Sequence, residues 1–286
     1  MSNKFFFVFF FVFFFSCKMD KKDTYATGEI SLAIDPSLYD IADALTYRYM
    51  QAYPEAKIKL QQVKEKEALK DLLNRKVSSI IMSRDLTAEE KSIYQQKIDK
   101  DFQPAYFAAD ALVFIVPKNS PLEQISVDEI KNFLTDGKRK LIFDGANTSN
   151  TDYIAERLKL DQGKIEYSSL QSNENIIEEL NHYPHHIGVI SLNSISRPFG
   201  EKAKALRSKI KILAVSNGQG SYLPEKPYLK SRQYPFTRLL YFLTNENYFG
   251  VAKGLIRYSC TDIGQKIVDK NGLQPYNLYK REVQIK

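Results

Sequence analysis

Residues 108–121 read AADALVFIVPKNSP, and this stretch indicates how the chain is divided. The unbroken apolar run from Ala111 to Val116 is typical of a strand that is buried on both faces. Pro117 closes the run, because proline has no amide hydrogen with which to continue a strand ladder. Short apolar runs alternate with helical patterns both before and after this strand. We therefore expect two α/β lobes, with the chain leaving the first lobe near Pro117.

Outward from this strand, the apolar pattern predicts the rest of both lobes. Strands are expected at 29–34, 56–63, 77–82, 140–143, 187–192, 210–215 and 234–244, and one long amphipathic helix at 248–270. Strands that alternate with helices imply a mainly parallel sheet covered on both faces. We expect residues 28–116 to form the first part of lobe one, 117–210 to form lobe two, and 211–286 to form the return crossover and the rest of lobe one. Because ligands of such sheets bind beyond the carboxyl ends of strands, a ligand cleft is expected between the lobes.

The first 17 residues have the features of an export signal. Lys4 precedes eleven Phe and Val residues, Phe5–Phe15, and Ser16 and Cys17 follow. This run is shorter than the roughly 20 residues that a membrane-spanning helix needs, so residues 1–16 are expected to be a cleaved signal peptide. The tetrad that ends in Cys17 resembles a bacterial lipobox, in which the cysteine is diacylated. We expect a periplasm-facing lipoprotein of the cell envelope, held at the membrane by Cys17 and the tether 17–27; an ordinary signal with an incidental cysteine is the alternative.

The overall charge excludes few partners by itself. The formal net charge is +7 at pH 7, which suits an anionic ligand, an anionic membrane surface or a nucleic acid. Lysines are scattered singly with acids between them, and no basic stripe with interleaved aromatics is present, so no nucleic-acid partner is expected. If Cys17 carries lipid, Cys260 is the one cysteine left for the folded domain and forms no intrachain disulfide.

Small polar residues follow three expected strands at the point where a helix begins. Such positions offer hydroxyls and unpaired amide groups to an anion, although each is also a common way to cap a helix. The candidate ligand-binding residues at these strand ends are Asp35, Ser37, Ser83, Arg84, Asn147, Thr148, Ser149, Asn150 and Thr151.

Two further charges are candidates for the same site. The guanidinium of Arg84 offers a planar fork for two oxygens of a phosphate, sulfate or carboxylate, and its alternative is a surface ion pair with Asp85 or Glu89. Asp110 precedes the apolar strand. A carboxylate beside a bound anion requires an anion that carries a proton, because two unprotonated charges would repel each other.

The sequence contains no motif for catalysis or for a cofactor. Three histidines, His182, His185 and His186, share one turn, but no Cys, Asp or Glu is interleaved with them to complete a zinc site. Neither a nucleophile elbow, nor a zinc-protease motif, nor a phosphate-binding P-loop is found. We therefore expect neither an enzyme such as a phosphatase, nor a metal, nor a cofactor.

Six segments of the chain follow one another in a recognisable order: IIMSRDLTAEE (80–90), AADALVFIVPKNSP (108–121), ISVDEIKNFLTDG (125–137), IGVISL (187–192), YPFTRLLYFLTNE (234–246) and GQKIVDKNGLQP (264–275). In this order they resemble the phosphate-binding component of ABC phosphate importers, most of all the shorter lipoprotein versions found in Bacteroidetes. The resemblance runs from about Gly28 to Pro275.

This resemblance implies a two-lobed periplasmic-binding-protein fold of the second type, which closes over an anion and delivers it to a membrane permease. It implies phosphate or a related small oxyanion as ligand, an ABC permease in the inner membrane as partner, and a monomer. Carried over by position, the family's three binding loops fall on 35–37, 83–84 and 147–151. The usual Gly-Ser-Thr first loop is replaced here, and the third loop lacks the usual glycines and arginine. A lipid-anchored adhesion or envelope-assembly module that keeps the fold without transport is the alternative function.

Overall fold

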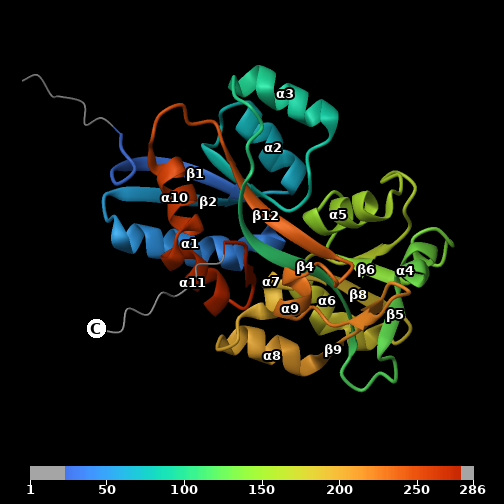
Figure 1. Ribbon diagram of the computed structural model, residues 1–286. Coiled ribbons are helices and arrows are strands. Elements are labelled where there is room, and N and C mark those ends of the chain that lie inside the picture. Colours follow the sequence, from blue (N-terminus) through green and yellow to red (C-terminus); the bar gives the residue numbers. More distant parts are fainter. Residues whose placement is uncertain (1–22, 278–286) are drawn as a thin grey trace, which may run out of the picture.

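The first lobe is a sheet with helices on both faces (Figure 1). The computed structural model describes residues 23–277; the expected signal peptide, Cys17 and residues 17–22 of the expected tether lie outside this range. β1 pairs in parallel with β2 and β3, and β12 runs antiparallel beside β3. The elements of this lobe are β1 (Gly28–Ile34), η1 (Pro36–Leu38), α1 (Tyr39–Ala52), β2 (Ala56–Gln62), α2 (Glu65–Leu73), β3 (Ser79–Met82), α3 (Ala88–Ile98), β12 (Thr237–Thr244), α10 (Val251–Cys260), α11 (Asp262–Lys270) and β13 (Gln274–Pro275).

The side chains of β1 show how both faces of this sheet are buried. Leu32 and Ile34 join the hydrophobic cluster that includes residues of α1 and α10, whereas Ala33, between them, joins a second cluster with residues of α2 and α3. Successive strand residues point to opposite faces, so the two clusters are the two sides of one sheet. The expected burial of both faces is confirmed, whereas the expected mainly parallel pairing holds for β1, β2 and β3 but not for β12, which pairs antiparallel with β3.

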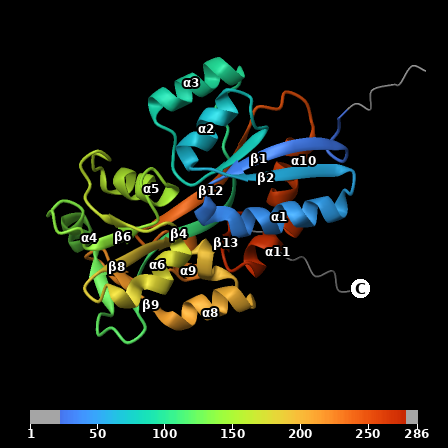
Figure 2. The ribbon, with the colours of Figure 1, turned by 180° about the vertical axis from the view of Figure 1, so that it is seen from behind.

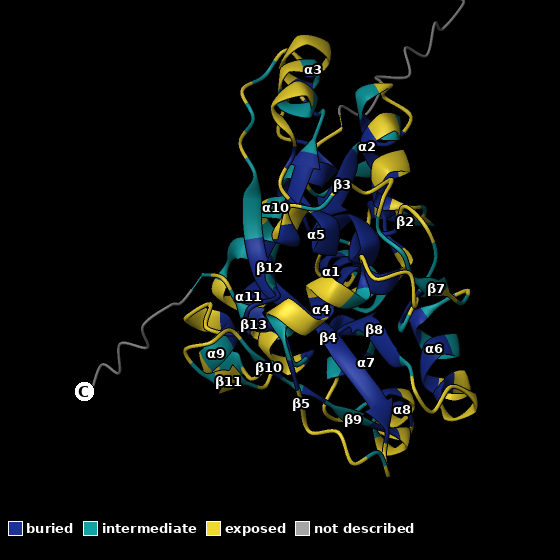
Figure 3. Ribbon diagram, turned by 90° about the vertical axis from the view of Figure 1, so that its right-hand side faces the viewer, coloured by how far each residue is buried: buried dark blue, intermediate teal, exposed yellow. Residues whose placement is uncertain are grey.

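β4 (Ala105–Pro117) connects the two lobes. All of its residues from Phe107 to Pro117 are buried, and it crosses the middle of the molecule in Figure 3. Its first half pairs with β12 and β13, and its second half pairs with β8 and β9, in each case antiparallel. The expected strand 111–116 is therefore the central part of a longer strand that belongs to both lobes.

The second lobe repeats the layered arrangement (Figure 2). β6 pairs in parallel with β7 and β8, and a small separate sheet contains β5, β10 and β11. Its elements are β5 (Gln124–Ser126), α4 (Val127–Phe133), β6 (Leu141–Phe143), α5 (Ser149–Leu158), β7 (Ser168–Ser169), α6 (Asn173–Glu179), η2 (Leu180–His182), β8 (Ile187–Ser191), α7 (Asn193–Ser196), α8 (Glu201–Lys209), β9 (Ile210–Ile212), β10 (Ala214–Ser216), β11 (Ser221–Tyr222) and α9 (Lys226–Lys230). β9 and β10 pair with β4 and β5, so the chain returns to the first sheet through β12. The lobe boundaries proposed from the sequence at 116–117 and 210–211 remain predictions.

The helix expected over 248–270 is wrong in two respects, because it begins at Val251 and is broken at Thr261. α10 ends at Cys260 and α11 begins at Asp262. The hydroxyl of Thr261 accepts a hydrogen bond from the amide of Gly264, and its backbone is extended. Threonine is a strong helix N-cap, which starts a new helix here in spite of a continuous apolar stripe. Within residues 23–277, no helix combines the length and apolar character that crossing a membrane requires.

Candidate functional site

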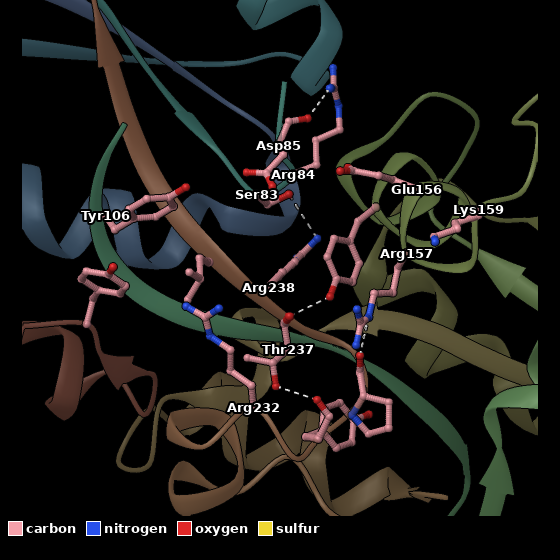
Figure 4. Close-up of a pocket in the computed structure, with 15 residues that line it drawn as sticks. Ser83, Arg84, Asp85, Tyr106, Glu156, Arg157, Lys159, Arg232, Thr237 and Arg238 are labelled. Carbon is pink, nitrogen blue, oxygen red and sulfur yellow. Dashed lines mark hydrogen bonds between the residues drawn. The ribbon is translucent and has the colours of Figure 1, made fainter. Parts of the chain in front are cut away.

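Two serine hydroxyls from separate loops contact one buried arginine, and a third serine contacts one of them. Ser37 Oγ lies 2.8 Å from Ser149 Oγ. Nη1 of Arg238, which comes from β12, lies 3.4 Å from Ser149 Oγ and 3.5 Å from Ser83 Oγ. All four residues are at most 3% exposed. Figure 4 shows Ser83 and Arg238 pointing toward each other between the lobes. The first lobe contributes Ser37 and Ser83, and the second contributes Ser149. We call these four residues the serine–arginine cluster.

Asp110 holds the arginine in place. It faces Arg238 directly in the β4–β12 ladder, and its Oδ2 accepts a hydrogen bond from Nε at 2.8 Å and lies 2.7 Å from Nη2. Nη2 makes no hydrogen bond of suitable angle among the described residues. The carboxylate also accepts hydrogen bonds from Ser191 Oγ at 2.8 Å and from the amide of Asn193 at 2.9 Å. Both carboxylate oxygens of Asp110 are thus engaged by donors within the protein, and the role of Asp110 is to orient Arg238.

The carboxylate of Asp35 accepts hydrogen bonds from two of the backbone amides that the sequence predicts as donors to an anion. Its Oδ1 accepts from the amide of Ser37 and its Oδ2 from the amide of Ser149, each at 3.0 Å. Ser149 is the first residue of α5, where the helix dipole favours negative charge. The second contact crosses between the lobes. Asp35 therefore shows that this helix start receives an anionic oxygen, and it brings the two lobes together.

Two further acids, the buried Glu65 and the half-buried Asp144, lie near Asp35. Burial raises the pKa of Glu65 to about 7, although the Arg84 guanidinium partly opposes the rise. Its Oε1 accepts from the amide of Ser83, and its Oε2 has no hydrogen-bond partner in the described structure. Burial, reinforced by the charge of Asp35, raises the pKa of Asp144 to about 6. Neither Glu65 nor Asp144 is predicted from the sequence as a site residue, because an acid near a helix start is usually a surface residue.

Arg84 is turned away from the cluster. Its Nη1 and Nη2 donate to the two carboxylate oxygens of Glu90 at 2.8 and 2.7 Å, and Nη1 also donates to the carbonyl of Asp85. Figure 4 shows its guanidinium on the far side of Ser83 from Arg238. The guanidinium beside the serines belongs to Arg238, which the sequence reasoning missed. The available signal was an arginine within the otherwise apolar run of residues 234–244.

The third predicted loop contributes one side chain to the cluster, that of Ser149. Thr148 and Thr151 cap the start of α5 reciprocally. The side-chain amide nitrogen of Asn150 donates to Oδ2 of Asp144 at 3.0 Å and to Oδ1 of Asn173 at 3.1 Å. Asn147 is exposed on a turn with φ 58°. Thr148, Thr151 and Asn150 therefore shape the loop, and Ser149 is the residue that reaches the arginine.

The histidine turn is separate from this site. His182 Nδ1 lies 2.9 Å from a carboxylate oxygen of Glu179, and both side chains are largely exposed. In the part of the chain that the structure describes, no three His, Cys, Asp or Glu side chains are grouped so that they could hold a metal ion. At the serine–arginine cluster, the hydroxyls and the guanidinium are donors suited to hydrogen bonding and charge pairing with an oxyanion.

The chain belongs to the PBP superfamily, because the sequence model of the PBP superfamily domain matches residues 21–262. The sequence is 23% identical over 279 residues to the phosphate-binding protein PstS of Borreliella burgdorferi, covering 90% of this chain and 92% of that protein. The family and fold expected from the sequence are thereby confirmed.

Solved structures share the two-lobed fold. A putative phosphate ABC transporter substrate-binding protein with bound phosphate from Clostridium perfringens aligns with a TM-score of 0.71 at 17% identity, covering 87% of this chain and all of that one. An ABC-type phosphate transport receptor from Vibrio cholerae aligns with a TM-score of 0.66 at 17% identity, covering 86% of this chain and 99% of that one.

Proposed function

We propose that this protein is the substrate-binding component of an ABC importer, and that it captures phosphate or a related small oxyanion between its lobes. The observation that carries the proposal is that Arg238 contacts the hydroxyls of Ser83 and Ser149, and that Ser149 in turn contacts the hydroxyl of Ser37. Hydroxyls and a guanidinium are donors that suit an oxyanion, and charge-assisted hydrogen bonds are the strong ones. The phosphate-binding relative supports the same ligand class.

The buried carboxylates favour an oxyanion that carries a proton. Asp35 lies within the site with both oxygens directed at amide groups. An arriving anion would meet this charge, and the repulsion is relieved where the ligand donates a proton into a hydrogen bond with the carboxylate. Hydrogen phosphate has such a proton near neutral pH and sulfate has none. We therefore expect phosphate to bind in preference to sulfate.

The rest of the proposal concerns delivery. A diacylated Cys17 would hold the domain at the membrane, since two acyl chains suffice for stable anchoring. The protein would then act as a monomer in the cell envelope, next to its permease in the inner membrane, without catalysis.

Calorimetric titration of the purified protein with phosphate, sulfate and molybdate tests the proposal. We expect a dissociation constant near micromolar for phosphate, which corresponds to about 8 kcal/mol. Phosphate at 100 times that constant should stabilise the fold by about 2.7 kcal/mol. If none of the three anions produces heat or thermal stabilisation, the proposal fails. The alternative is then an envelope module that keeps the fold without transport.

A further inference from the structure

The serine–arginine cluster is adjoined by a cavity of about 460 Å³ (Figure 4). Ser83 and Arg238 line this cavity, whereas Ser37 and Ser149 do not. An oxyanion held against Arg238 and Ser83 would therefore have one side that faces open space. A site for a simple inorganic ion has no need of this space, because its donors can enclose the ligand completely.

Three cationic side chains line the cavity besides Arg84 and Arg238. Arg157 and Lys159 come from the end of α5, and Arg232 comes from the loop before β12. Among residues 23–277, the side chains of Lys159 and Arg232 make no hydrogen bond or ion pair, and Arg157 uses its Nε alone, which donates to the carbonyl of Pro235 at 2.8 Å. Three basic groups beside a cavity with so few protein acceptors can receive an anion.

The acids of the cavity lie elsewhere. Asp85 and Glu156 line it too, but Figure 4 shows both beside Arg84, whereas Arg157 and Arg232 lie on the opposite side near Thr237. Arg157 and Arg232 thus form a cationic part of the cavity next to β12, the strand that carries Arg238, and Lys159 lies beyond Arg157 in this view. A second negative group would be attracted to this cationic part.

Resting on the proposed function, we propose that the site accepts a phosphate bearing a second anionic group, of which diphosphate is the simplest. One phosphoryl group lies at Arg238 and Ser83. The second group lies in the cavity, where Arg157, Lys159 and Arg232 neutralise it. Guanidinium forks match phosphoryl and carboxylate oxygens in pairs, so these residues provide recognition of shape as well as of charge.

Titration of the intact protein with inorganic phosphate, methyl phosphate and diphosphate tests this. We expect diphosphate to bind at least tenfold more tightly than phosphate. Methyl phosphate fills space without a second charged group and should bind no more tightly than phosphate. The double variant Arg232→Asn with Lys159→Gln should lower diphosphate affinity tenfold or more and leave phosphate affinity within twofold. Asparagine suits position 232 because its backbone has φ 58°.

Lys230→Gln is the matched control. Lys230 is an exposed cation two residues from Arg232 that does not line the cavity, and its replacement should change neither affinity. Diphosphate that binds more weakly than phosphate would overturn the inference, as would a double variant that weakens both anions by the same factor. If phosphate binds and diphosphate does not, this inference alone fails. If none of the three anions binds, the proposed function fails with it.

Discussion

Ser37 and Ser149 are 112 positions apart in the sequence, and their hydroxyl oxygens lie 2.8 Å apart in the fold. One serine stands at the start of η1 in the first lobe and the other at the start of α5 in the second. The contact therefore exists where the lobes meet. A ligand that engages both hydroxyls would be held by both lobes at once, which couples binding to lobe closure.

Arg238→Lys should weaken phosphate binding tenfold or more. Lysine keeps a positive charge beside Asp110 but loses the planar fork that reaches Ser83 and Ser149. One charge-assisted hydrogen bond is worth about 1.5–3 kcal/mol. Titration calorimetry measures the loss, with Arg48→Lys, an exposed position on α1, as control. Unchanged affinity in the Arg238 variant would remove Arg238 from the binding site.

Ser149→Ala and Thr148→Ala should have different signatures. The Ser149 hydroxyl does not cap α5, so its replacement should lower phosphate affinity by about 0.5–1.5 kcal/mol and, through the lost contact with Ser37, cost a similar amount of stability. Thr148 caps α5, so its replacement should cost about 1 kcal/mol of stability. Titration and urea unfolding of both variants separate the two roles. If the Ser149 variant loses stability alone, Ser149 is a structural residue.

Stability should fall as pH rises from about 4.5 to about 7. Burial raises the pKa of Glu65 from 4.5 to about 7, so the folded state binds more protons than the unfolded state between these values, and protonation favours folding there. The full effect of the group is roughly 3–4 kcal/mol. Urea unfolding across this pH range should show a smaller slope in Glu65→Gln than in Glu67→Gln, the exposed neighbour on α2. Parallel profiles for the two variants would contradict the buried, protonated state.

Lys64→Met with Lys66→Met should speed the release of ligand severalfold. Lys64 Nζ donates to the carbonyl of Ala146 at 2.8 Å, and Lys66 Nζ lies 3.5 Å from Asp152 Oδ1, so both reach from the first lobe to the second. Exposed contacts of this kind are worth about 0.2–1 kcal/mol each. Stopped-flow dissociation measures the change, and Lys59→Met on β2 is the control. Equal release rates in all variants would show that these contacts do not hold the lobes closed.

Mass spectrometry of the mature N-terminus tests the export signal. We expect a chain that begins at Cys17 with two acyl chains attached, and a Cys17→Ala variant that is no longer retained by membranes. A mature chain that begins elsewhere with an unmodified terminus would favour the ordinary cleaved signal.

Local features were predictable from the sequence where short-range energies decide them. The apolar run around Ala111 is a buried strand, and the cap of α3 at Thr87 with Glu90 follows from adjacent residues. Local rules were insufficient at Thr261, because the apolar stripe of α10 and α11 continues through a residue that also caps a helix. Two local signals competed there, and the capping threonine prevailed.

By itself, the sequence determined the two-lobed α/β class, the family, and the serines at helix starts that mark the candidate site. The tertiary structure alone decided which charges meet them. Arg84 was the arginine nearest these loops along the chain, yet it pairs with Glu90, whereas Arg238 is brought to the serines by its register opposite Asp110 in the β4–β12 ladder. Caps and strands depend on neighbours within a few residues, but a pocket depends on contacts between distant segments, and those are set by packing of the whole chain.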